Sequence, residues 1–353
     1  MSKPVELPSY YAIDSYHPDR IPEQNVSTER NLLHKISGTR LPWGNTQDVA
    51  PDNIMEDPKP KSMRFWEQSE KEKAEMKANG TYVPRPLEHI DLHYKYDHER
   101  FRFAKLPFRS QFWLSLKIFC KWGLIILLPP SILTDIIFEL DSSNFDFKEL
   151  ISYSTTILVL KTLLAPWIFS SIIINYFPRF WFRPPKGPLW ELNRRTGLVT
   201  IFDYKNFKKE GAIEKVTAPF YEFDAYIVTS PDRQGLAMNG LFLIHRYRDI
   251  RINLNDLITP DNTTQKPCAL WDFLQNFMDI SRPLPDIPMY EAHRHLDPVT
   301  AEHDRKASRE PRYWIDMDDD TFKAKVKEML GRIDAIDTFS RPNLMAKHVK
   351  YVD

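Results

Sequence analysis

Two long apolar stretches, at 111–140 and 150–177, dominate the hydrophobic pattern of an otherwise polar chain. A helix needs about 20 residues to cross the roughly 30 Å hydrocarbon core of a bilayer, and each stretch is long enough. The linker between them, from Asp141 to Glu149, is too short to hold a domain. The pattern predicts a transmembrane hairpin with spans at about 113–140 and 150–177. The alternative is a pair of buried helices in a soluble protein.

Basic residues flank this hairpin on its outer sides and predict its orientation. Five Lys or Arg residues lie between 95 and 109, before the first span, and five lie between 179 and 195, after the second. The linker carries only Lys148. Because Lys and Arg are retained on the cytoplasmic side of a membrane, we expect both termini in the cytoplasm.

Two charged residues lie inside the predicted spans, Asp135 in the first and Lys161 in the second. When the first span crosses from Trp122 to Leu140, Lys117 and Lys121 can extend to the cytoplasmic face, and Asp135 lies at about the depth of Lys161. A charge at the centre of a span costs about 2.5–3.5 kcal/mol on insertion scales. We therefore expect Asp135 and Lys161 to form an intramembrane ion pair.

The segment 1–110 contains 11 prolines, which prevent long regular elements. It is expected to be a partly irregular cytoplasmic arm with one helix, from Ser62 to Ala78, that stops at Asn79-Gly80.

Beyond the spans, period-two patterns predict two β-hairpins and a short strand, at 189–193 with 198–204, at 219–229 with 236–247, and at 251–254. Helical spacing follows at 269–279. The fold class is therefore α+β, with a cytoplasmic module at 178–282 whose arrangement resembles a pleckstrin-homology-like fold, an analogy that carries no function by itself. A proline-rich connector and C-terminal helices, one at 319–333, are expected within 283–353.

The composition of the chain disfavours several classes of function. The 48 basic and 48 acidic residues balance and are dispersed, which disfavours nucleic acid as a partner. Only 10 glycines occur, and no GxGxxG, GxxxxGK[ST] or GxSxG motif is present, so no cofactor and no enzymatic activity are expected. Cys120 and Cys268 are isolated, which disfavours a disulfide framework or a thiolate zinc site.

A histidine-rich segment offers the densest set of possible metal ligands. On a strand, His293 and His295 would lie on one face, and His303 could complete a three-nitrogen site. A metal-dependent enzyme built on these three residues is therefore one hypothesis. The alternative is a polar surface loop whose basic side chains form ion pairs, namely Arg294, Arg305, Lys306 and Arg309.

Two segments carry a resemblance to a known group of proteins. These are WELNRRTGLVTIFD at Trp190–Asp203 and the stretch from Trp271 to Trp314, which includes PLPDIPMYEAHRHLDPVTAEHDRKASREPRYW. The chain resembles uncharacterised proteobacterial inner-membrane proteins with two spans, encoded beside type VI secretion effectors. The resemblance implies a bacterial inner-membrane location and a role as immunity protein or effector-loading accessory of a secreted antibacterial toxin.

Three hypotheses follow: a non-enzymatic membrane protein that binds a toxin, a membrane-tethered regulatory or scaffold module that binds a peptide or lipid headgroup, and the metal-dependent enzyme. Homo-oligomers are compatible with each. For the first hypothesis, exposed aromatic and arginine side chains are the expected contacts, because these residue types dominate interfaces. The candidates are Trp190, Arg246, Tyr247, Trp271 and Trp314, and the alternative for each is a role in the core or as a bilayer anchor.

Overall fold

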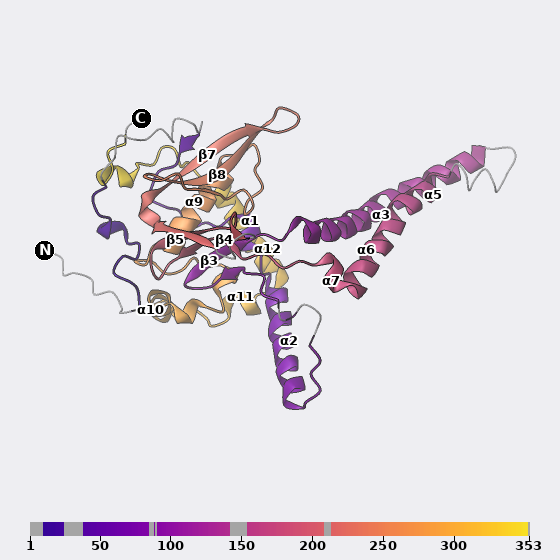
Figure 1. The fold of residues 1–353 in the computed structure, drawn as a ribbon, viewed down its shortest axis with the longest axis horizontal. Helices are drawn as coiled ribbons and strands as arrows, with labels where there is room; N and C mark the ends of the chain where they lie inside the picture. The colour runs from indigo at the N-terminus through magenta and orange to yellow at the C-terminus, as the bar shows by residue number, and fades with distance from the viewer. Residues whose placement is uncertain are drawn as a thin grey trace. The chain divides into compact units, whose positions relative to one another are not determined.

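The computed structural model describes most of the chain, namely residues 10–24, 38–84, 88, 90–141, 154–207 and 213–351. The chain divides into two compact units (Figure 1). The first comprises 1–82, 94–103 and 188–353, and the second comprises 83–93 and 104–187. These two units do not coincide with the four segments expected from the sequence, because the N-terminal arm, the module and the C-terminal tail all contribute to the first unit.

The first unit contains a five-stranded sheet with the strand order β2-β3-β4-β5-β6. Its strands are β2 (Lys95–Tyr96), β3 (Arg100–Ala104), β4 (Pro188–Asn193), β5 (Leu198–Asp203) and β6 (Glu214–Pro219). The β4/β5 hairpin confirms the first predicted hairpin, with Trp190 opposite Ile201. β5 continues antiparallel into β6. The period-two pattern predicted β4 and β5, whereas β2, β3 and β6 were not predicted.

A second, four-stranded sheet has the order β1-β7-β8-β9. It is formed by β1 (Thr39–Arg40), β7 (Phe223–Pro231), β8 (Ala237–His245) and β9 (Arg251–Asn253). β7 and β8 form the second predicted hairpin, and β9 confirms the predicted short strand. β1 pairs with β7 and comes from the N-terminal arm. Because a two-residue strand has no detectable periodicity, the sequence did not predict it.

The core of this unit forms around helix α9 (Gln265–Met278), in which every residue from Pro267 onward is buried. The helix confirms the one predicted at 269–279. The ring of Trp271 lies 4.8 Å from that of Trp43 in an edge-to-face contact, and its Nε1 donates to the Pro42 carbonyl at 2.9 Å. Such pairs stabilise a core beyond the area they bury. The N-terminal segment 41–50 therefore supplies core residues despite its irregular backbone.

Further helices and turns lie around the two sheets. They are α1 (Asp52–Met55), α2 (Pro60–Ala78), α10 (Pro298–Lys306), α11 (Tyr313–Asp316) and α12 (Asp319–Asp334), with 3-10 turns η1 (Pro18–Arg20), η4 (Phe220–Glu222), η5 (Pro288–Tyr290), η6 (Arg294–Leu296) and η7 (Leu344–Lys347). α2 and α12 confirm the helices predicted at 62–78 and 319–333. α2 contacts α11 and α12 near its start, whereas its last turns are exposed and extend away from the sheets in Figure 1.

The second unit is a hairpin of two apolar helical segments. The first is α3 (Phe108–Asp141), and the second comprises α5 (Thr155–Val159), the π-helical turn η3 (Leu160–Leu164) and α6 (Ala165–Tyr176), followed by the short α7 (Pro178–Trp181). Phe108–Phe138 and Thr155–Tyr176 are each long and apolar enough to cross a membrane, and only 11% of the most apolar window of each is buried. Core helices of a soluble protein would be mostly buried. The predicted linker falls, beyond Asp141, outside the described residues.

The expected ion pair between Asp135 and Lys161 is wrong. The carboxylate of Asp135 accepts hydrogen bonds from the backbone N–H groups of Thr155 and Thr156 at 2.9 and 3.0 Å and from the hydroxyl of Ser154. Free N–H groups at the start of a helix stabilise a carboxylate without a cation. Among the described residues, Lys161 forms no ion pair with Asp135 or with another carboxylate.

Candidate functional site

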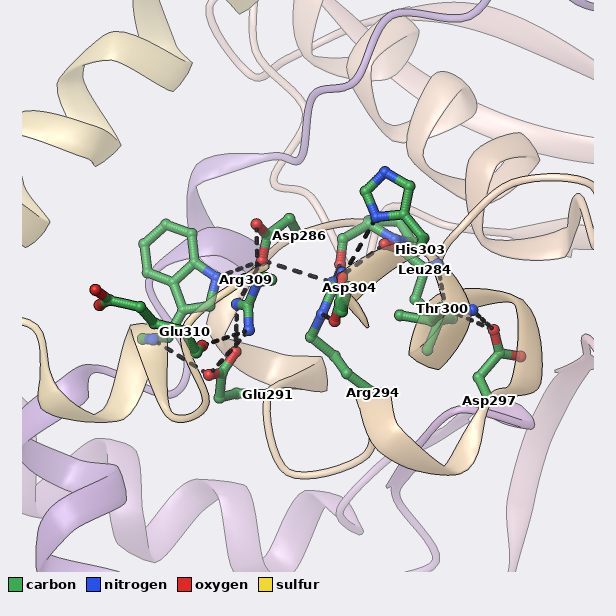
Figure 2. A network of polar contacts seen from close by, with 12 residues as sticks. Leu284, Asp286, Glu291, Arg294, Asp297, Thr300, His303, Asp304, Arg309 and Glu310 are labelled. Atoms are coloured by element: carbon green, nitrogen blue, oxygen red, sulfur yellow. Dashed lines mark hydrogen bonds and ion pairs between the residues drawn. The ribbon is translucent and has the colours of Figure 1, made fainter. Parts of the chain in front are cut away.

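A polar cavity of about 370 Å³ lies in the first unit, between the segment that follows α9 and helix α10 (Figure 2). Its walls combine residues from three distant parts of the chain: the N-terminal segment, the end of α9 with its connector, and the histidine-rich segment. The lining residues are Thr46, Asp48, Asn276, Arg282, Pro283, Leu284, Pro285, Asp286, Arg294, His303, Asp304 and Arg309.

Arg294 holds one wall of the cavity in place. Its Nε and Nη2 donate to the two carboxylate oxygens of Asp304, both at 2.7 Å, a two-point geometry that is among the strongest side-chain pairings. Its Nη1 also donates to the carbonyl of Leu284 at 3.2 Å. Burial by itself would raise the pKa of Asp304, but the hydrogen bond and charge of Arg294 outweigh it and hold this pKa below its usual value.

A second arginine joins two further carboxylates. The Nη2 of Arg309 donates to Asp286 at 2.8 Å and to Glu291 at 2.6 Å. The indole Nε1 of Trp314 donates to the same Asp286 at 2.9 Å. Together with Arg294 and with the surface pairs that Arg305 and Lys306 form with Glu302, these contacts confirm the predicted ion pairs. The segment is not a surface loop, however, because it contains helix α10 and Arg294 is buried.

The carboxylate of Asp297 connects the cavity to the core. It is fully buried and accepts hydrogen bonds from the hydroxyl of Tyr11 at 2.6 Å, from Arg194 Nε at 3.2 Å and from the backbone N–H of Thr300 at 3.0 Å. Thr300 Oγ1 in turn accepts from the backbone N–H of Leu284, in the cavity wall, at 2.8 Å. Burial opposes ionisation of Asp297, but Arg194 and these hydrogen bonds outweigh it and lower its pKa. A chain of buried contacts therefore sets the position of the wall (Figure 2).

Arg282 and His303 are cavity side chains that can donate hydrogen bonds to an anionic ligand. Arg282 Nη1 donates to Thr46 Oγ1 at 2.9 Å and to Asn276 Oδ1 at 3.0 Å, and within the described parts of the chain its side-chain acceptors are neutral. His303 is exposed, and its Nδ1 lies 3.4 Å from Asp304. A guanidinium in this state can bind an anionic group of a ligand.

The three histidines proposed as metal ligands do not converge. His293 and His295 flank Arg294 at the start of the 3-10 turn η6, and a turn of this kind does not place residues i and i+2 on one face as a strand does. The ring of His293 lies 6.2 Å from that of His98, in a stacked orientation. No group of three or more potential ligands occurs among the residues that the structure describes.

The predicted partner-binding residues do not line the cavity, and four of them are buried. The expectation that these four are exposed is therefore wrong, and their burial fits the alternative of a core role. Trp190, Arg246, Trp271 and Trp314 each have an exposed fraction of 4% or less. Trp190 stacks on Phe103, and Arg246 forms a buried ion pair with Asp224 at 2.7 Å. Tyr247 is half-buried and donates to Gln24 at 2.8 Å. Large aromatic residues have the same sequence signature in a core and in an interface, so the pattern does not separate the two.

Several cavity residues were not singled out from the sequence, among them Arg282, Thr46 and Asp48. Each lies in a polar stretch with no motif, and more than 200 positions separate Arg282 from the N-terminal pair. Comparison of the chain with protein-family models, with curated proteins and with solved structures finds no match.

Proposed function

We propose that this chain is a membrane-anchored, non-enzymatic binding protein whose folded unit holds a protein partner on the cytoplasmic side of a bacterial inner membrane. The observation that carries the proposal is the pairing, in one chain, of an exposed hairpin of two apolar helices with a folded unit of two sheets. Exposed apolar helices of this length are stable in a bilayer and not in water. The basic flanks of the hairpin support the orientation.

The proposed partner is a secreted antibacterial toxin, with this chain as its immunity protein or as an accessory that loads it for type VI secretion. This part of the proposal is supported only by the sequence resemblance. The linker of the hairpin spans about nine residues, which leaves little surface on the far side of the membrane. A toxin that inserts into the membrane or acts in the cytoplasm therefore fits better than one that acts in the periplasm.

A second candidate is a membrane-tethered scaffold module that binds a peptide or a lipid headgroup. The polar cavity favours it, because Arg282 and His303 offer donors to an anionic group beside the apolar wall of Leu284. Two antiparallel sheets followed by the buried helix α9 also support the proposed pleckstrin-homology-like arrangement.

Topology is tested first, with single cysteines and a maleimide that does not cross membranes. Intact cells should label Asn144→Cys, in the linker, and should leave Asn79→Cys, after α2, unlabelled until they are opened. The two native cysteines are buried and provide a low background. Labelling of Asn79→Cys in intact cells would contradict the orientation, and release of the protein by carbonate washing would contradict membrane insertion.

Partner binding is tested by purifying the tagged full chain in mild detergent and identifying co-purified proteins by mass spectrometry. A toxin-like partner should bind the purified chain directly. Growth during expression of that toxin, with and without this chain, then separates protection from loading. If the isolated protein binds lipid headgroups and no protein, the scaffold alternative replaces the toxin hypothesis.

A further inference from the structure

A groove with an apolar floor and a basic rim lies between the start of α2 and helix α12, away from the polar cavity. Its volume is about 410 Å³. The floor is formed by Phe322, Val326 and Leu330. The remaining lining residues are almost all charged, namely Glu56, Lys59, Lys61, Asp319, Lys323 and Lys327, with Ser62 beside them.

The floor residues follow one face of α12. Phe322, Val326 and Leu330 are spaced four residues apart, so they lie above one another on successive turns. Eight residues of helix rise by about 12 Å. The floor is therefore a row about two turns long in which Phe322 and Val326 are buried and present only their outer edges, and Leu330 is half-buried. Its spacing matches the repeat of an apolar face on a second helix.

Lysines outnumber carboxylates on the rim of the groove. Lys59 is paired with Glu56 at 2.9 Å, and Lys323 with Asp320 at 3.1 Å. Lys61 and Lys327 line the groove and, among the described residues, form no ion pair. Four lysines therefore face two lining carboxylates, and two of the lysines are available to a ligand.

We propose that this groove binds an amphipathic helix of a partner protein, with apolar side chains on one face and acidic side chains beside them. Apolar residues of the partner would lie on the floor, and its carboxylates would pair with Lys61 and Lys327. The inference rests on the proposed function, a protein-binding role, and names the chemistry of the segment that is recognised. Complementary charge at the rim of such a groove determines the choice of partner and the rate of association.

The test uses the full chain in phosphatidylcholine nanodiscs and two fluorescent peptides of about 18 residues, or five helical turns. Both peptides carry leucines on one face, and the flanking positions are glutamate in one and lysine in the other. Binding is measured by anisotropy, and empty nanodiscs provide the blank. The acidic peptide should bind at least about tenfold more tightly than the basic one, and added salt should reduce the difference.

Two variants locate the binding. The double change Lys61→Glu with Lys327→Glu should weaken the acidic peptide by about tenfold or more and strengthen the basic one. Lys325→Glu is the control, because Lys325 lies on the same helix outside the groove, where it pairs with Glu328 at 3.4 Å, and the change should leave both affinities within about twofold. Both lysines of the double variant are exposed, so the fold should persist, which thermal unfolding checks.

Equal binding of the two peptides, or no effect of the double variant, would overturn the proposal. Binding of laurate in place of either peptide would identify an acyl chain as the occupant, and a dimer dissociated by the double variant would identify a second copy of this chain. Both results also contradict the proposal. If co-purification recovers a partner that the double variant binds unchanged, the groove hypothesis fails while the proposed function stands.

Discussion

Replacement of Arg194 by methionine tests the buried contacts that position the polar cavity. The Arg194 side chain has no exposed surface and pairs with the equally buried carboxylate of Asp297. Its two Nη atoms donate to the carbonyls of Phe277, Asp279 and Arg282, at 2.5, 2.8 and 2.6 Å. It therefore caps the end of α9 and fixes the connector that forms the cavity wall.

The magnitude follows from what the substitution leaves behind. Arg194→Met removes the cation and leaves Asp297 as a buried charge, and removing one partner of such a pair costs about 3–5 kcal/mol. Asp297 keeps its hydrogen bonds from Tyr11 and Thr300, so we expect about 4 kcal/mol, near the middle of that range. At about 2–4 °C per kcal/mol for a unit of this size, the Tm should fall by roughly 8–16 °C.

The assay is thermal unfolding of the full chain in detergent micelles, followed by tryptophan fluorescence. Arg195→Met is the matched control in the adjacent position. Arg195 is about half exposed, and its pair with Glu99 at 3.3 Å lies near the surface, so its loss should cost under about 1 kcal/mol. The double variant Arg194→Met with Asp297→Asn should recover part of the loss, because no buried charge then remains unpaired.

The Tm difference between the wild-type protein and Arg194→Met should depend on pH in a defined direction. In the native protein the pKa of Asp297 is held below its ordinary value, so the pair stabilises the fold at neutral pH and this stabilisation is lost as pH falls below about 4. In Arg194→Met, burial dominates and favours the neutral acid. The difference in Tm between the two proteins should therefore shrink with acidification. Equal Tm values for the Arg194 and Arg195 variants at pH 7 would refute the reasoning.

Three further predictions concern the thiol, the hairpin and the cavity. Burial raises the pKa of Cys268 to about 11, so at pH 8 only about one thiol in a thousand is ionised and iodoacetamide should label it only after unfolding, as mass spectrometry can show. Reversing both Asp135 and Lys161 should not restore the membrane accumulation lost on reversing Asp135 alone, whereas rescue would support the ion pair. Arg309→Ala should lower the free energy of unfolding by about 2–4 kcal/mol and shift the Trp314 emission to longer wavelength, and an unchanged spectrum would count against the network.

Local patterns were enough to predict most of the regular elements. The hairpin β4/β5 is recognisable because two short, largely apolar segments flank a turn signal, and helix α9 because its apolar residues have helical spacing. Strands β1, β2, β3 and β6 escaped prediction. The first three are short and lie in a segment expected to be partly irregular, and β6 overlaps the predicted strand at 219–229 only in its last residue. Their place in the sheets depends on partners from other parts of the chain.

Much less of the candidate site than of the regular elements could be predicted from the sequence. Arg294 and Arg309 were recognised as possible ion-pair partners, since they lie among acidic residues in the same segment. No sequence pattern marked Arg282 as a site residue, because its hydrogen-bond partners Thr46 and Asn276 contact it only in the folded unit. Trp190 and Trp271 were candidates for an interface with a core role as the alternative, and the fold uses their apolar area in the core.

The sequence by itself determined the two apolar helices, the β-hairpins and the amphipathic helices, since each follows from the order of apolar and polar residues within one short segment. Only the tertiary structure decided that Asp135 binds the start of α5, that the N-terminal segment enters the core, and that Arg282 faces a cavity. These outcomes depend on contacts between residues that are distant in the chain. Periodicity carries no information about such contacts, because it reports which side of an element is buried and not which partner covers it.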